Sequence, residues 1–300
     1  MITEEIRLWD DADYAVLQTY ILKDSPEYQT GRKRPAVIIC PGGGYLGTTD
    51  REAEPVALRF TACGYHAFVL RYTTYYKAYS ADHANPPPGN PRSRYPQPLL
   101  DLARAVQTLR LHADDWNADG DKIIVCGFSS GGHLAACLGV HWQAELIRDA
   151  LKAPSEMFKP NALILGYGLF DFMIMKAKNK AKDASLELWH LSNEAMFGHA
   201  EPTDEELMDC SPVFHVTAST PPAFIWHTSD DGLVYPENAL FMAAALGRHQ
   251  VPYELHLFES GSGVHGLSLS DAVTAIYPGH VIPSVAVWFD LAMNWLKKRF

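Results

Sequence analysis

The 300-residue sequence lacks several features that would indicate particular functions. No run of about 18 consecutive apolar residues is present, so no membrane-spanning helix is expected. Residues 1–13 are acidic and lack the basic start and apolar stretch of a secretory signal peptide. Basic residues are in the minority, with 25 Lys and Arg against 35 Asp and Glu, and the net charge is -10. Because nucleic acids and anionic membranes are themselves negative, we expect neither as a partner.

Signatures of metal and cofactor sites are also missing. The five cysteines form no CxxC pair, and the HExxH pattern of zinc hydrolases is absent. We therefore expect no metal and no cofactor. An odd number of cysteines within apolar surroundings, such as those of Cys40 and Cys126, is typical of free thiols packed as small apolar side chains. Free thiols are typical of a reducing compartment, so we expect the protein in the cytoplasm.

Short apolar runs alternate with segments of helical periodicity. The expected strands are residues 15–22, 35–40, 66–72, 122–128, 162–167, 222–228 and 253–258. The expected helices are residues 52–64, 99–116, 133–142, 237–249 and 284–300. Continuous apolar strands are typical of a sheet buried on both faces. The pattern predicts an α/β fold, a mostly parallel central sheet with helices on both faces, in a single domain over residues 1–300.

Two segments interrupt this alternation. Residues 73–98 are rich in proline and tyrosine, and we expect them to shape the wall of a site. Residues 170–216 lie between two expected strands and contain short helical pieces, so we expect a lid or cap insert there. The basic run at residues 176–183 within this insert is interpreted as a solvated face.

One strand-to-helix corner contains a GxSxG motif centred on Ser129. In such a corner the serine oxygen projects above the sheet, and the residues two before and two after it come too close to backbone to carry a Cβ. Those residues are Gly127 and Gly131, whereas Ser130 would have Phe128 two residues before it. The spacing therefore predicts Ser129 as the nucleophile and leaves Ser130 to donate its backbone N–H to an oxyanion.

A serine nucleophile needs a base and an acid that orients the base. Asp231 and His265 follow the last two expected strands, in the order Ser, Asp, His that this kind of corner requires. Asp171, after an earlier strand, and Asp230, beside Asp231, remain alternatives for the acid.

Other histidines are less well placed to act as the base. His133 falls on the helix after the corner, His256 lies within a strand, and His280 lies near the last helix. His265, on a glycine-flanked loop, is the preferred base.

The segment PGGGY, residues 41–45, follows the strand at 35–40. Consecutive glycines let backbone N–H groups turn inward without a side chain in the way. We expect Gly43 and Gly44 to donate to the oxyanion together with Ser130, and Gly42 to set the turn. A flexible turn is the alternative. Tyr45 is a candidate substrate-binding residue, and no residue is assigned to a metal.

Together the segments PGGGY, YPQPLLDLARAVQTLR, GFSSGGHLAA, HTSDDGLVYPENA and GVHG resemble the α/β-hydrolase superfamily, in particular bacterial serine esterases of the acetyl-xylan-esterase-like and hormone-sensitive-lipase-like group. The resemblance covers residues 35–300 and implies an α/β-hydrolase fold with Asp231 as the acid. Pro41 stands where an HGGG loop has histidine, which points away from the typical hormone-sensitive-lipase branch.

The resemblance implies a serine carboxylesterase that hydrolyses short-chain acyl esters. The expected partner is a small-molecule ester, with acylated carbohydrate among the candidates, and association into homo-oligomers is left open. A serine exopeptidase of the same fold and a catalytically inactive binding protein are the alternatives. An exopeptidase would need an anchoring site for a peptide terminus and usually has an extra propeller domain. An inactive binder usually lacks a member of the Ser-His-Asp set, which is complete here.

Overall fold

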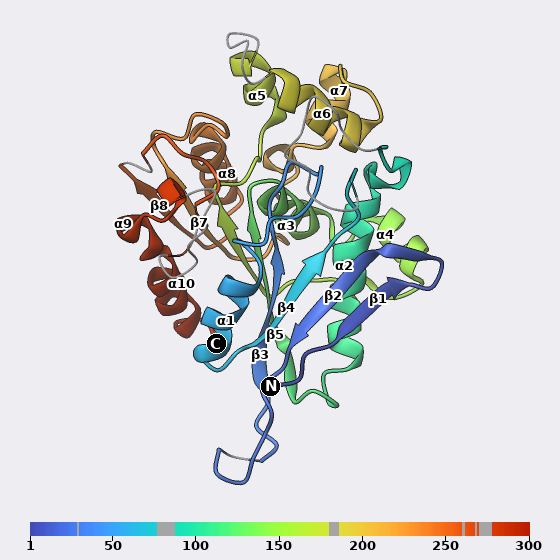
Figure 1. Cartoon of the computed structure of the whole chain (residues 1–300), viewed down its shortest axis with the longest axis vertical. Coiled ribbons are helices and arrows are strands. Elements are labelled where there is room, and N and C mark those ends of the chain that lie inside the picture. The colour runs from blue at the N-terminus through green and yellow to red at the C-terminus, as the bar shows by residue number, and fades with distance from the viewer. Residues whose placement is uncertain (29, 77–87, 180–185, 260–261, 268, 270–277) are drawn as a thin grey trace.

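The central element of the computed structural model is an eight-stranded sheet with strand order β1-β2-β4-β3-β5-β6-β7-β8 (Figure 1). The structure describes residues 1–300 except 29, 77–87, 180–185, 260–261, 268 and 270–277. The strands are β1 (Glu5–Trp9), β2 (Ala12–Tyr20), β3 (Arg34–Cys40), β4 (His66–Arg71), β5 (Ala118–Phe128), β6 (Ala162–Gly166), β7 (Ala223–Thr228) and β8 (Tyr253–Phe258). Strands β1, β2 and β4 pair antiparallel, and every pairing from β4 through β3 to β8 is parallel.

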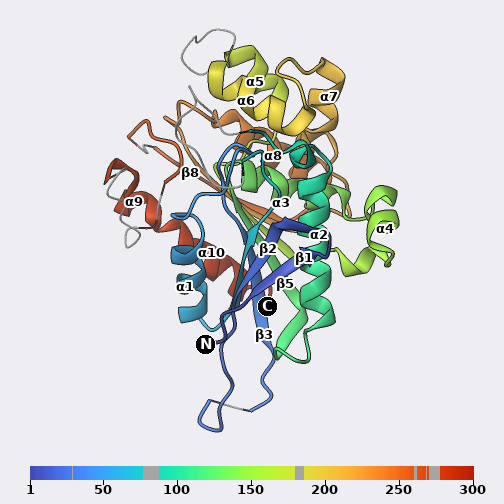
Figure 2. The ribbon, with the colours of Figure 1, turned by 45° about the vertical axis from the view of Figure 1, so that its right-hand side comes forward.

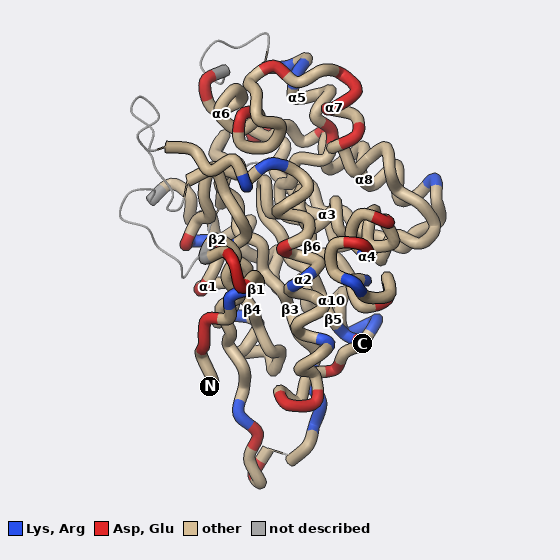
Figure 3. Tube along the Cα trace, turned by 90° about the vertical axis from the view of Figure 1, so that its right-hand side faces the viewer, with Lys and Arg blue, Asp and Glu red and all other residues tan. Residues whose placement is uncertain are grey.

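Helices cover both faces of this sheet (Figure 2). The helices of the described residues are α1 (Glu54–Ala62), α2 (Gln97–Leu111), α3 (Ser130–His141), α4 (Glu145–Leu151), α5 (Phe172–Asn179), α6 (Leu186–Phe197), α7 (Asp204–Asp209), α8 (Glu237–Arg248), α9 (Pro283–Ala286) and α10 (Trp288–Lys297). Helices α1 and α10 lie on one face, and α2, α3 and α8 lie on the other. Acidic and basic residues are interspersed over the outer helices and loops (Figure 3). No helix in the described part of the chain is both long enough and apolar enough to span a bilayer.

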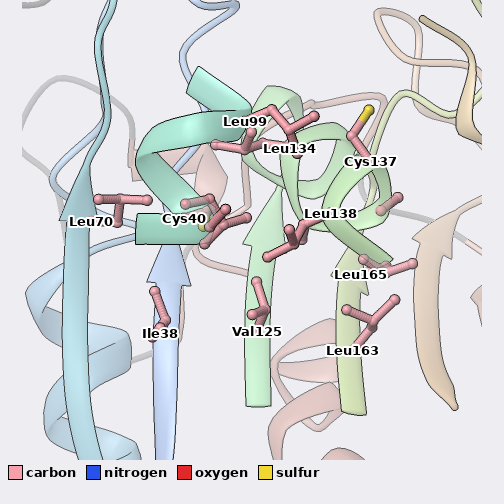
Figure 4. Packing of buried hydrophobic residues seen from close by; sticks show 14 of the residues in the cluster. Ile38, Cys40, Leu70, Leu99, Val125, Leu134, Cys137, Leu138, Leu163 and Leu165 are labelled. Carbon is pink, nitrogen blue, oxygen red and sulfur yellow. The ribbon is translucent and has the colours of Figure 1, made fainter. Parts of the chain in front are cut away.

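Alternate residues of the buried strands supply the two cores, because successive side chains of a strand point to opposite faces. Ile38 of β3 belongs to the same core as Leu99 of α2 and Leu138 of α3, on one side of the sheet (Figure 4). Val37 and Ile39, its neighbours in β3, pack on the opposite face with Phe60 of α1 and Phe289 of α10, and Ile38 itself is fully buried. A sheet covered on both faces explains why its strands appear as continuous apolar runs.

The predicted fold class is confirmed, and each expected strand is present, with bounds that agree for residues 253–258 and differ by a few residues for the others. Strand β1 was missed, because residues 1–13 were interpreted by charge alone. Its signal is the alternation of Ile6 and Leu8 with polar neighbours, followed by a tight turn that pairs Trp9 with Ala12. The last helix is divided into α9 and α10. All five cysteines are free, and only Cys63 is exposed.

The segment between β6 and β7 carries α5, α6 and α7, which lie beyond the carboxyl ends of the parallel strands (Figure 1). This is the segment in which the sequence predicts an insert. Part of its basic run falls outside the described residues. In the described part, Lys176 pairs with Asp204 and Lys178 pairs with Glu237.

The proline-rich segment lies partly outside the described residues as well. Its described beginning runs beside the glycine-rich loop, where the Tyr75 N–H donates to the Tyr45 carbonyl and the Tyr76 N–H to the Leu46 carbonyl, both at 2.9 Å. These bonds attach the residues after β4 to the loop after β3, at the carboxyl edge of the sheet where ligands of open α/β sheets collect.

Candidate active site

Ser129 occupies the corner between β5 and α3. Its φ of 54° and ψ of -122° are strained values for a residue with a side chain, as expected at a nucleophile corner. A Cβ on Gly127 would lie 2.1 Å from the Gly131 carbonyl oxygen, and one on Gly131 would lie 2.0 Å from the Cys40 carbonyl oxygen. These contacts confirm the steric prediction that both positions around Ser129 exclude any side chain.

The residues around Ser130 are arranged differently. Two residues before it, the Phe128 ring is buried among Tyr167, Trp226 and Trp288, at 5.6 to 6.4 Å between ring centroids. Phe128 therefore helps to build the core beneath the corner, and Ser130 begins α3.

Three side chains from different loops meet above this corner. The Ser129 Oγ lies 2.8 Å from His265 Nε2, and His265 Nδ1 lies 2.7 Å from Asp231 Oδ2. An ionised carboxylate can only accept a hydrogen bond, so Nδ1 carries the proton and Nε2 is left to accept from the serine hydroxyl. Asp231 follows β7 and His265 follows β8, so the parallel strands deliver all three groups to one edge of the sheet.

The environment of Asp231 keeps its carboxylate ionised. Burial by itself raises the pKa, but His265 and His227 outweigh burial and hold the pKa of Asp231 well below its usual range. Its other oxygen, Oδ1, accepts the backbone N–H groups of Leu233 and Val234 at 2.9 and 3.0 Å. His227 was missed by the sequence analysis, although it stands four residues before Asp231. It is fully buried, donates through Nε2 to the Val234 carbonyl and lies 3.4 Å from the Asp231 carboxylate.

The alternative acids have other partners. Asp230 Oδ2 accepts the Gly263 N–H at 2.9 Å, and Asp171 Oδ1 accepts the N–H groups of Met173 and Ile174 at the start of α5. Of the three candidates, Asp231 is the one that bonds to the His265 ring.

The other candidate histidines outside α3 also have partners other than Ser129. His256 pairs with Glu254 at 2.9 Å, and His280 Nδ1 donates to the Gly266 carbonyl at 2.9 Å.

Tyr45 and His133 form a buried pair behind the glycine-rich loop. The Tyr45 hydroxyl donates to His133 Nδ1 at 2.6 Å, and His133 Nε2 donates to the Cys210 carbonyl at 2.7 Å. Tyr45 was expected to bind substrate, but it is only 4% exposed and its hydroxyl is used by His133. The Tyr45 ring still lines the cavity, so its contribution there is an apolar wall.

The same pair predicts how stability depends on pH. Burial lowers the pKa of His133 to about 4, from an ordinary value of 6.5. Between these values the unfolded chain binds a proton that the folded protein does not, so the free energy of unfolding falls as the pH is lowered through this window. One proton corresponds to about 1.4 kcal/mol per pH unit, so at about pH 4.5 the loss is on the order of 2 to 3 kcal/mol. The variant His133→Asn is expected to lack this loss in urea unfolding at about pH 7 and pH 4.5, and an equal loss in variant and wild type would contradict the assignment.

The glycine-rich loop adopts conformations that favour glycine, with φ of 137° at Gly43 and 63° at Gly44. The expected set of oxyanion donors needs one correction. The Gly44 N–H donates to the Ser130 hydroxyl oxygen at 2.9 Å, so this N–H already has an acceptor. Tyr72 stands behind the same hydroxyl, 3.3 Å away, and donates to the Pro41 carbonyl at 2.8 Å. The Ser130 side chain, to which the sequence analysis gave no role, therefore holds the loop.

A cavity of about 240 Å³ opens above Ser129 and His265. Its roof consists of apolar side chains from the insert: Phe172 and Met175 of α5, and Leu188, Trp189 and Met196 of α6. The sequence analysis assigned none of these five residues to a pocket. Their signal was helical spacing: Phe172 and Met175 stand three residues apart on one face of α5, and Leu188 and Met196 stand about two turns apart on one face of α6.

Comparisons with known proteins agree with this architecture. The family model BD-FAE matches residues 25–246. The acetyl ester-xyloside bifunctional hydrolase of Caldicellulosiruptor lactoaceticus is 31% identical, with a TM-score of 0.72 over 98% of this chain and 96% of that one. The carboxylesterase Cest-2923 of Lactobacillus plantarum WCFS1 is 28% identical, with a TM-score of 0.78 over 100% and 98% of the two chains.

Curated relatives are longer proteins. Endo-1,4-beta-xylanase B of Butyrivibrio fibrisolvens is 32% identical over 240 residues, which are 80% of this chain and 33% of that protein. Esterase LipC of Mycobacterium tuberculosis (strain ATCC 25618 / H37Rv) is 26% identical over 92% of this chain and 62% of its own length. The chain thus spans about a third of the first relative and about three fifths of the second. The match to the family model shows that the chain belongs to the BD-FAE family, and the sheet topology and the similar structures show that it has the α/β-hydrolase fold.

Proposed function

We propose that this protein is a serine carboxylesterase that uses Ser129, His265 and Asp231. The observation that carries the proposal is the continuous pair of hydrogen bonds, 2.8 Å from Ser129 to His265 and 2.7 Å from His265 to Asp231, on a strained corner. An unactivated serine hydroxyl is a weak nucleophile, and this arrangement supplies the base and the group that orients it.

The reaction follows from where the protons are. His265 Nε2 takes the hydroxyl proton as Ser129 Oγ bonds to the ester carbonyl carbon, and the Nδ1 proton stays in its bond to Asp231. The tetrahedral intermediate collapses to an acyl-enzyme when Nε2 returns the proton to the departing alcohol. Water then attacks the acyl carbon, with His265 again as the base, and releases the carboxylic acid and the free serine.

Backbone N–H groups stabilise the oxyanion in this proposal. Ser130 provides one at the first position of α3, where the helix dipole also favours negative charge, and Gly43 provides another. The Gly44 N–H joins them only when it leaves the Ser130 hydroxyl that it binds here.

A small acyl ester fits the cavity best. Its volume of about 240 Å³ lies below the roughly 300 to 1,000 Å³ of pockets that enclose drug-sized ligands. We propose that residues 170–216 act as a cap over it and that residues 1–300 form one domain. Two similar proteins carry names that mention xylan-derived substrates, a xylanase and an acetyl ester-xyloside hydrolase, so acetyl groups on such sugars are the natural substrates to test.

The test of the proposed substrate class is a series of p-nitrophenyl esters beside acetylated xylo-oligosaccharides. We expect kcat/KM to be highest for acetate and butyrate and to fall by roughly tenfold or more at octanoate, because a longer chain does not fit beneath α5 and α6. An aminoacyl anilide serves as the control for peptidase activity. Faster cleavage of the anilide than of any ester would contradict the esterase proposal, and a rate that rises with chain length would contradict the short-chain preference.

A further inference from the structure

Glu52 is a buried carboxylate in the wall of the cavity, between the glycine-rich loop and α1, and is only 2% exposed. We propose that Glu52 is a positioning residue that keeps the glycine-rich loop aligned with the His265 ring. The inference rests on the proposed esterase function. Its basis is that each oxygen of this carboxylate holds a different side of the site.

The first oxygen holds the glycine-rich loop. Oε2 accepts the Gly42 N–H at 2.7 Å and also accepts the Thr49 hydroxyl. The Thr49 N–H in turn donates to the Gly42 carbonyl at 2.9 Å and closes the loop. A Cβ on Gly42 would lie 2.8 Å from both Glu52 Oε2 and the Ser129 Cβ, so the loop is held directly against the serine. The position of Gly43, the next residue, therefore depends on Glu52.

The second oxygen holds the wall behind the base. The Tyr167 hydroxyl donates to Glu52 Oε1 at 2.7 Å and also lies 3.0 Å from the Leu267 carbonyl, two residues beyond His265. The Tyr167 and His265 rings pack edge to face, with their centroids 5.1 Å apart and their planes at 78°. Tyr167 has a φ of 35°, a strained value that its surroundings must maintain. Through Tyr167, Glu52 thus fixes the side of the imidazole that faces away from solvent.

The preceding residue reinforces the same alignment. Arg51 Nε donates to the Gly266 carbonyl at 2.7 Å, and His280 Nδ1 donates to that carbonyl as well. Arg51 and Glu52 therefore connect the glycine-rich loop with the loop that carries His265. The separation of these two loops sets the distance between the oxyanion donors and the base. Transition-state stabilisation is sensitive to such distances, because the donors must point to where the charge develops.

The positioning role of Glu52 comes from its hydrogen bonds and not from its negative charge. A carboxylate beside an oxyanion hole opposes the negative charge of the transition state, so its charge does not assist the reaction. What the site uses is its hydrogen bonds, and glutamine can reproduce them. The amide oxygen would accept from Gly42 and Thr49. The amide nitrogen would donate to the Tyr167 oxygen, and the Tyr167 O–H would then donate to the Leu267 carbonyl.

The experiment measures kcat and KM of p-nitrophenyl acetate hydrolysis for wild type, Glu52→Ala and Glu52→Gln, per folded protein as judged by circular dichroism. We expect Glu52→Ala to lower kcat by on the order of 100-fold with KM little changed, and Glu52→Gln to stay within about tenfold of wild type. The matched control is Glu54→Ala, two residues along on the exposed start of α1, with an expected change below about twofold. If Glu52→Ala fails to fold, Tyr167→Phe replaces it with an expected tenfold loss in kcat.

Two results would overturn the inference. The first is a wild-type kcat in the folded Glu52→Ala variant, or in Tyr167→Phe where that variant replaces it. The second is a loss of kcat in Glu52→Gln as large as the loss in Glu52→Ala. Wild-type protein without esterase activity would count against the proposed function itself, because the inference concerns only the ratio between variants.

Discussion

Replacement of Ser129 by alanine is expected to lower kcat for p-nitrophenyl acetate by about a millionfold, the loss typical of a serine hydrolase without its nucleophile. The physical reason is that no other group occupies the position of Ser129 Oγ, 2.8 Å from the base and at the tip of a strained corner. Rate measurement on purified protein, with folding verified by circular dichroism, gives the result. The cavity above the corner stays intact in this variant, so substrate binding should persist.

The matched control is Ser130→Ala, one residue along the chain. Its backbone N–H remains after the substitution, and the hydroxyl that is lost accepts the Gly44 N–H and shares a 3.3 Å hydrogen bond with the Tyr72 hydroxyl. We expect this variant to keep most of the wild-type activity, within about tenfold, because one loop contact is removed and no reacting group is lost. Equal losses at the two serines, or a loss at Ser130 alone, would refute the division of roles between them.

The second large effect is expected at Asp231. Asp231→Asn should lower kcat by about 10,000-fold, because an amide can donate to His265 Nδ1 and thereby favour the tautomer whose Nε2 carries a proton and cannot accept one from serine. The pKa of Asp231 is held well below its usual range, so the wild-type carboxylate is ionised at neutral and mildly acidic pH. The gap between variant and wild type should therefore persist across that range, as measured by kcat against pH.

The two alternative acids, Asp230 and Asp171, provide controls for Asp231. Asp230→Asn retains an acceptor for the Gly263 N–H, and Asp171→Asn retains one for the start of α5, so each should leave kcat within about tenfold of wild type. A loss at Asp171 as large as that at Asp231 would reassign the acid to the earlier strand.

The strands and the corner could be predicted because their signals are local. Buried strands appear as apolar runs, and the GxSxG spacing follows from contacts among residues 127–131 and the end of β3. The grouping of Asp231 and His265 with Ser129 needed only one further rule, that parallel strands deliver their following loops to the same edge of the sheet.

Other features of the site depend on which side chains meet across the fold, and sequence periodicity does not contain that information. The direction of the Tyr45 hydroxyl is set by His133, 88 residues away. Glu52 meets Tyr167 across 115 residues, and the bond from Gly44 to the Ser130 hydroxyl spans 86. Each of these pairs joins a residue of the loop after β3 to a residue far away in the sequence. The local pattern PGGGY therefore predicted a loop but not its contacts.

Covalent labelling with a fluorophosphonate, followed by peptide mapping, tests the central claim most directly. The reagent bonds to a serine oxygen only where a base takes up the hydroxyl proton and N–H groups face the phosphoryl oxygen. We predict a single adduct on Ser129, lost in Ser129→Ala and retained in Ser130→Ala. An adduct on Ser130 would contradict the assignment of Ser129 as the nucleophile, and no adduct on the folded wild-type protein would contradict a nucleophile at this corner.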